Sequence, residues 1–67
     1  METITLDIPN ISCHHCIMTV ERETGFVKGA EFVSADLDAK QAVVKVKDQA
    51  TLQNLKATLA EAGYPVA

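Results

Sequence analysis

Apolar and polar residues alternate with a period of two in three stretches of the chain, and this pattern predicts three β-strands. Pro9 and Asn10 end the first strand, because proline donates no hydrogen bond to a sheet and asparagine favours turns. Residues 38–41 connect the second strand to the third as a hairpin. The side chains expected to face inward are Ile4, Leu6 and Ile8 in the first strand, Val33, Ala35 and Leu37 in the second, and Ala42, Val44 and Val46 in the third.

Two other stretches repeat apolar residues every three or four positions, and this spacing predicts two helices. The first covers residues 15–24 and ends at Gly25. We expect it to be short or frayed, because Thr24 is a weak core residue and the opposite face is fully polar. The second helix is capped near Thr51 and ends at Gly63. The residues expected on the buried faces are Ile17, Val20 and Thr24 in the first helix and Leu52, Leu55, Leu59 and Ala62 in the second.

The predicted elements follow one another in the order of a ferredoxin-like fold. Strand, helix, strand, strand and helix are followed by residues 64–66, which are long enough only for a very short last strand. This order predicts an α+β, βαββαβ sandwich in which both helices cover one face of an antiparallel sheet. Residues 1–67 form a single domain, since no linker or repeat interrupts the pattern.

Composition narrows the possible functions. Hydrophobic residues make up 48% and charged residues 22% of the chain, as in a folded globular domain. The net charge of −3 offers no basic surface for nucleic acid. No apolar run approaches the roughly 18–20 residues that a membrane span needs. Residues 1–4 lack the charged and apolar regions of a signal peptide, so we expect a cytoplasmic protein without membrane insertion.

The candidate chemistry lies in one tetrapeptide, Cys13-His14-His15-Cys16, which contains every cysteine and histidine of the chain. Two thiolates in a C-x-x-C motif can hold one ion, and thiolate selects soft metals such as Cu(I) and Zn(II). Cys16 falls in the first turn of the predicted helix, where the helix dipole favours thiolate over thiol. We therefore expect Cys13 and Cys16 to bind metal, on an exposed loop that a partner's thiolates can reach.

These residues, together with the predicted element order, resemble the heavy-metal-associated domain family of small copper chaperones and N-terminal modules of metal-transporting P-type ATPases. The resemblance covers essentially all of the chain. It rests on Ile8 through Cys16, Val20-Glu21, Gly29-Ala30, the segment from Val33 to Leu37, Leu55, Leu59 and the closing Glu61-Ala62-Gly63-Tyr64.

The resemblance implies that Cys13 and Cys16 bind one Cu(I) in a near-linear arrangement and pass it on through intermediates that share sulfur ligands. The implied partners are a copper-transporting P-type ATPase or another copper-handling protein with a C-x-x-C motif, and a metal-bridged homodimer is a further possibility. Tyr64 and His15 match residues that lie near the metal loop in bacterial chaperones, so they are candidates to tune the cysteines.

Some residues depart from the family pattern. Asn10-Ile11 stands where the family usually has Gly-Met, and Ile11 can supply similar apolar bulk as a tether for the loop. Ser12 stands where the zinc and cadmium branch often has an aspartate ligand, which favours Cu(I). His14 favours zinc instead, because imidazole is a good zinc ligand.

Three alternatives to a copper chaperone stay open: a zinc or mercury handler on the same fold, a structural zinc site, for which the chain supplies only three plausible ligands, and a thiol–disulfide redox protein. The same fold can carry a zinc or mercury site, although two thiolates and one imidazole leave tetrahedral zinc without a fourth ligand. A thiol–disulfide redox protein also uses C-x-x-C, but the chain is short for a thioredoxin fold. We expect no enzyme, because both histidines lie in the metal loop and no glycine-rich phosphate loop is present.

Overall fold

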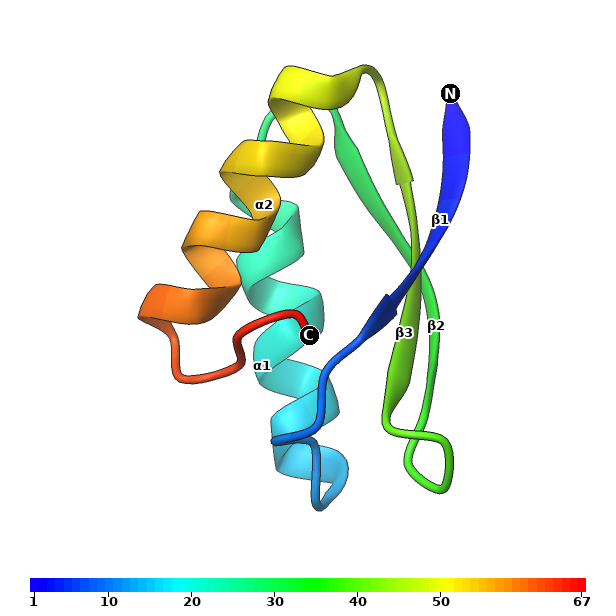
Figure 1. Cartoon of the computed structure of the whole chain (residues 1–67), viewed down its shortest axis with the longest axis vertical. Coiled ribbons are helices and arrows are strands. Elements are labelled where there is room, and N and C mark those ends of the chain that lie inside the picture. Colours follow the sequence, from blue (N-terminus) through cyan, green and yellow to red (C-terminus); the bar gives the residue numbers. More distant parts are fainter.

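Three strands form one antiparallel sheet in the computed structural model, which describes residues 1–67. The sheet has the order β1-β3-β2, and helices α1 and α2 both lie against the same face of it (Figure 1). The ferredoxin-like arrangement predicted from the sequence is therefore confirmed. The elements are β1 (Glu2–Asp7), α1 (His14–Gly25), β2 (Ala30–Asp36), β3 (Gln41–Val46) and α2 (Gln49–Glu61).

Strands β1 and β3 follow the predicted alternation. They pair in register from Glu2 opposite Val46 to Asp7 opposite Gln41. The inward side chains of β3 are fully or almost fully buried, as are Leu6 in β1 and Ile8 just beyond it. Period-two patterning was sufficient here because one face of each strand meets the helices and the other does not.

Strand β2 differs from the prediction at one residue. Phe32 pairs with Val44, but the next paired residue, Ser34, lies opposite Val43, so Val33 is an extra residue in a β-bulge. The bulge turns Val33 outward, where it is 48% exposed, and places Phe32 against the core. The expected inward position of Val33 was wrong, whereas Ala35, beyond the bulge, does face the core.

Helix α1 is neither short nor frayed, contrary to the expectation from its polar residues. It spans 12 residues, and its buried residues are Cys16, Val20 and Thr24. The Thr24 hydroxyl donates a 2.7 Å hydrogen bond to the Val20 carbonyl one turn earlier. That bond satisfies the buried hydroxyl, so Thr24 can present its methyl group to the core like an apolar residue.

Helix α2 begins one turn earlier than its predicted cap. Asp48 is the N-cap, and its carboxylate accepts bonds of 2.8 Å from the Thr51 N–H and 2.9 Å from the Thr51 hydroxyl. Thr51 is thus a buried donor inside the helix and not the cap. Neither α1 nor α2 is long and apolar enough to cross a membrane.

The predicted last strand is reduced to one contact. Residues 64–67 have no regular secondary structure. The Ala67 N–H donates a 2.7 Å hydrogen bond to the Asp7 carbonyl at the end of β1, where a fourth strand would pair. The chain end is therefore tied to the segment that leads into the Cys13–Cys16 loop.

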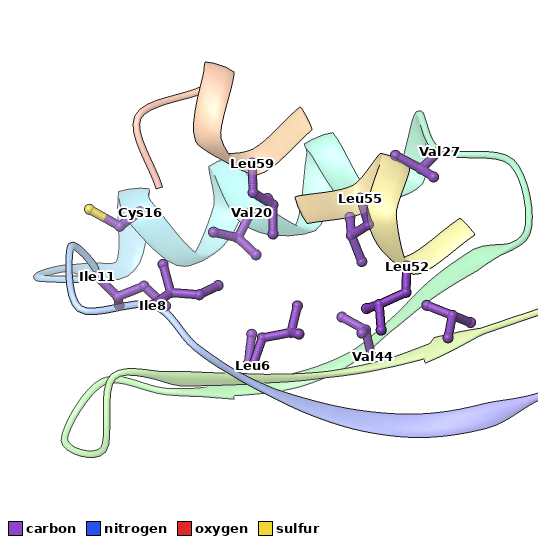
Figure 2. Packing of buried hydrophobic residues seen from close by; sticks show 12 residues of the cluster. Leu6, Ile8, Ile11, Cys16, Val20, Val27, Val44, Leu52, Leu55 and Leu59 are labelled. Atoms are coloured by element: carbon purple, nitrogen blue, oxygen red, sulfur yellow. The ribbon is translucent and has the colours of Figure 1, made fainter. Parts of the chain in front are cut away.

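Buried side chains fill the space between the helices and the sheet (Figure 2). Cys16 belongs to this core and lies at one end of it, near Ile8 and Ile11. The candidate site is therefore built on the edge of the packed interior. The core comprises Leu6, Ile8, Ile11, Cys16, Val20, Val27, Ala42, Val44, Val46, Leu52, Leu55 and Leu59.

Candidate metal centre

The loop between β1 and α1 is anchored by two isoleucines. Ile8 and Ile11 are both fully buried, and the Ile11 N–H donates a 3.1 Å hydrogen bond to the Ile8 carbonyl. Ile11 thus packs into the core as the predicted apolar tether. Burial at this point holds the residues that follow against the body of the domain.

Cys13 and Cys16 come together at the start of α1. Cys13 is the N-cap residue, and its carbonyl accepts bonds from the N–H groups of Cys16 at 3.1 Å and Ile17 at 3.3 Å. This first turn brings the two Sγ atoms within 3.6 Å of each other, with both cysteines free. Cys13 is exposed, whereas Cys16 is only 8% exposed, with its sulfur turned away from Ile8 and Ile11 (Figure 2).

The surroundings of Cys16 favour its thiolate. Hydrogen bonding from the Tyr64 side chain, followed by bonding from the backbone and hydroxyl of Ser12, lowers the pKa of Cys16 from 9.0 to about 6, and burial opposes this only in part. The Ser12 Oγ lies 3.7 Å from the Cys16 Sγ. The same contact with Cys16 is the main reason why the pKa of Tyr64 is raised. At neutral pH the site therefore presents at least one thiolate.

The sulfur spacing can be compared with metal geometry. With metal–sulfur bonds of about 2.3 Å, two sulfurs lie about 3.8 Å apart in a tetrahedral site and about 4.6 Å apart in a linear one. The observed 3.6 Å is thus near the tetrahedral edge, and a linear ion requires the pair to open by about 1 Å. Rotation of the exposed Cys13 side chain can supply that opening, since little surrounds it.

His14 and His15 do not complete a larger ligand set. No group of three or more histidine, cysteine, aspartate or glutamate side chains is placed to hold a metal ion. Both histidines are exposed. His14 contributes instead to the wall of a hollow of about 490 Å³ beside the β2–β3 hairpin, together with Ile17 and Leu37. An auxiliary ligand role for either histidine stays a prediction.

Two residues near the cysteines have contacts that sequence reasoning missed. Ser12 was weighed only as a missing aspartate, yet its hydroxyl faces the Cys16 sulfur. The Asn10 side-chain amide donates a 2.9 Å bond to the Gly63 carbonyl, 53 positions away. The Ser12 contact could have been anticipated from its place beside a helix N-cap, but the Asn10 contact has no local signal.

Comparison with known proteins places this site among metal-handling domains. The family model of the heavy-metal-associated domain matches residues 5–65. The COP-associated protein of Helicobacter pylori strain J99 is 33% identical over 63 residues, which cover 94% of this chain and 96% of that protein. The mercuric transport protein periplasmic component of Pseudomonas aeruginosa is 37% identical over 65 residues, which cover 96% of this chain and 71% of that protein.

The fold is also similar to that of solved structures. A solved structure from work on crosstalk between Cu(I) and Zn(II) homeostasis superposes on this chain with a TM-score of 0.85 at 28% sequence identity. The match covers 100% of this chain and 97% of that one. The family match thus spans the segment that contains Cys13 and Cys16.

Proposed function

Because this chain belongs to the heavy-metal-associated domain family, we propose that it binds one Cu(I) ion between Cys13 and Cys16 and passes it to a partner by ligand exchange. The observation that carries the proposal is the pair of sulfurs 3.6 Å apart, with no third potential ligand side chain grouped with them. Two thiolates suit soft Cu(I), whereas structural zinc normally takes four protein ligands. Cu(I) is accordingly the proposed cargo and Zn(II) the weaker alternative.

The unequal burial of the cysteines assigns them different parts in this proposal. Cys16 is packed in the core and has the lowered pKa, so it is the anchoring thiolate. Cys13 is exposed at the tip of the loop, so its sulfur is the one that an incoming thiolate can replace first. Transfer then proceeds with the ion held by Cys16 until the partner supplies its second sulfur.

Mercury is the second candidate cargo, and one specific comparison favours it. The relative with 37% identity is a mercuric transport component, and Hg(II) is also a soft ion that a dithiolate can hold. That relative is a periplasmic component, so the identity of the bound metal and the cellular compartment of this protein have to be considered together. We propose a cytoplasmic Cu(I) carrier, because reduced cysteines persist in that compartment.

The partner follows from the same chemistry. We propose a copper-transporting P-type ATPase or another copper-handling protein whose own C-x-x-C can share the ion with Cys13 and Cys16. A second copy of this chain offers the same ligands, so a metal-bridged homodimer belongs to the proposal. No catalytic reaction is proposed, and ligand exchange accounts for the placement of both cysteines.

An anaerobic competition titration tests the cargo. Reduced protein is offered Cu(I), Hg(II) and Zn(II) against colorimetric chelators, and native mass spectrometry counts ions and chains. The proposal expects one Cu(I) per monomer or per metal-bridged dimer, with zinc displaced. Cys13→Ser and Cys16→Ser should each abolish tight binding while circular dichroism stays unchanged.

Other outcomes separate the alternatives. Preferred retention of Hg(II) would favour mercury transport, and retention of zinc would make His14 a ligand to test by His14→Ala. If no ion binds tightly, the reduction potential of the cysteine pair becomes decisive. A value within about −120 to −270 mV would indicate a thiol–disulfide oxidoreductase.

A further inference from the structure

Besides the contact between Tyr64 and Cys16, one side-chain hydrogen bond joins the metal loop to the C-terminal segment. The Asn10 amide donates to the Gly63 carbonyl at 2.9 Å, across 53 positions of sequence. Asn10 lies three residues before Cys13, and Gly63 directly precedes Tyr64. The bond therefore connects the two segments that approach Cys16 from opposite ends of the chain.

The backbone hydrogen bonds of the Gly63 turn are local to the end of α2. The Tyr64 N–H donates to the Leu59 carbonyl at 2.8 Å, the Gly63 N–H donates to the Ala60 carbonyl at 3.1 Å, and both bonds stay within the end of α2. Gly63 has a φ of +95° and open space where a Cβ would stand, whereas Tyr64 and Val66 on its C-terminal side pack against the core. Among the hydrogen bonds made by Gly63 itself, the Asn10 bond is therefore the one that reaches the metal loop.

Tyr64 is the residue that this turn positions. Its side chain is half-buried and packs against the core that contains Cys16. Hydrogen bonding between the Tyr64 side chain and Cys16 places the two groups next to each other, while Cys13 is exposed. Movement of the turn carries Tyr64 with it, since the two residues are adjacent.

We propose that Asn10 is a positioning residue whose amide latches the Gly63 turn to the metal loop, holds Tyr64 beside Cys16 and so limits the access of outside thiols to that sulfur. The latch deepens the proposed function, on which its effect on metal transfer rests. It assigns a role to a residue whose side chain never touches the ion. Asn10 then affects the rate at which the ion is released, although it does not bind the ion.

The first test needs no metal. Tyr64 is the only tyrosine and the chain has no tryptophan, so tyrosine emission reports on this residue alone. Quenching of Tyr64 by acrylamide should increase about two-fold in Asn10→Ala and in Asn10→Asp. The aspartate variant keeps the size of the side chain but removes the donor. Loss of one hydrogen bond shifts the equilibrium between the attached and the detached turn by roughly a factor of five. Gln41→Ala is the matched control, because it removes another exposed amide bond, of 2.8 Å to Asp7, far along the chain. Equal quenching in wild type and both Asn10 variants would overturn the latch.

The second test follows the ion. A chelator should remove Cu(I) from Asn10→Ala about five-fold faster than from wild type, and this acceleration should disappear in a Tyr64→Ala background, which lacks the ring beside Cys16. The same acceleration in both backgrounds would show that Asn10 does not act through Tyr64, which overturns the proposal. If wild type retains no Cu(I), the proposed cargo fails, while the quenching result still decides whether the latch exists.

Discussion

The Ser12 hydroxyl oxygen lies 3.7 Å from the Cys16 sulfur, so a polar side chain in the loop before α1 faces the one buried cysteine. Together with Tyr64 it keeps the pKa of Cys16 near 6, well below the ordinary value of 9.0. Between these values the unfolded chain holds a proton on Cys16 that the folded chain has lost. Folding therefore releases a proton in this window, which makes stability depend on pH.

The reduced, metal-free protein should become more stable as the pH rises from about 6 to about 9, because the unfolded state binds more protons there. Below pH 6 this contribution is lost. Urea unfolding under reducing conditions at several pH values measures the effect. Cys16→Ser should flatten the pH dependence in this window, and an unchanged slope in that variant would assign the effect to other groups.

Thr24 should tolerate the loss of its hydroxyl better than the loss of its volume. Thr24→Val keeps the buried shape and should lie within about 1 kcal/mol of wild type, whereas Thr24→Ala leaves a cavity and should cost about 1–3 kcal/mol. Chemical denaturation measures both. Thr19→Ala, which breaks a similar 2.9 Å bond to the His15 carbonyl at the surface, should change stability by less than about 0.5 kcal/mol.

Glycine substitutions should separate backbone strain from crowding. Gly29 has a φ of +91°, and a Cβ there would meet the Thr51 hydroxyl at 3.1 Å and the Lys47 Cβ at 3.3 Å. Gly29→Ala should therefore cost more than the roughly 1–2 kcal/mol of a left-handed residue alone. Gly63→Ala, with the same backbone region but open space, should cost only that strain.

Gly25 is the matched control for these two variants. It lies at the end of α1, has no neighbour within 4 Å of a Cβ and no positive φ. Gly25→Ala should be neutral or stabilise the protein by up to about 1 kcal/mol. A destabilisation as large as that of Gly29→Ala would show that glycine is required for a reason other than φ or crowding.

Ile11 should accept the methionine that is usual in the family but not a smaller residue. The side chain is fully buried at the base of the metal loop, so Ile11→Met should cost less than about 1.5 kcal/mol and Ile11→Ala about 2–5 kcal/mol. Thermal unfolding measures both. Met18, 62% exposed, gives a control, since Met18→Ala should shift stability by no more than about 0.5 kcal/mol.

Local patterns predicted those parts of the fold that depend on neighbours in sequence. Strands β1 and β3 followed alternation, and the closeness of Cys13 and Cys16 followed from one helical turn. The β-bulge at Val33 was not predicted, because the apolar and polar residues alternate without a break and do not indicate an extra residue. The length of α1 was not predicted, because the sequence does not show that the Thr24 hydroxyl bonds to its own helix and lets the residue be buried.

Contacts between distant segments could not be predicted in the same way. Asn10 was expected to act through turn conformation, whereas its amide reaches Gly63. Asp48 and Thr51 are both residue types that can cap a helix. Because α2 begins directly after Asp48, the Asp48 carboxylate is the group that accepts the capping bond from the Thr51 N–H. Tyr64 was a candidate near the cysteines through family resemblance, and its influence on the pKa of Cys16 depends on how the chain end folds back.

The bulge in β2 also affects how copies of this protein meet one another. β2 is an outer strand of the sheet, with one row of backbone groups facing solvent. The extra residue at Val33 breaks the even spacing of those groups, so a neighbouring strand cannot continue the ladder along its full length. The β2 edge of this heavy-metal-associated domain is thereby less able to pair edge to edge with a second copy of the chain.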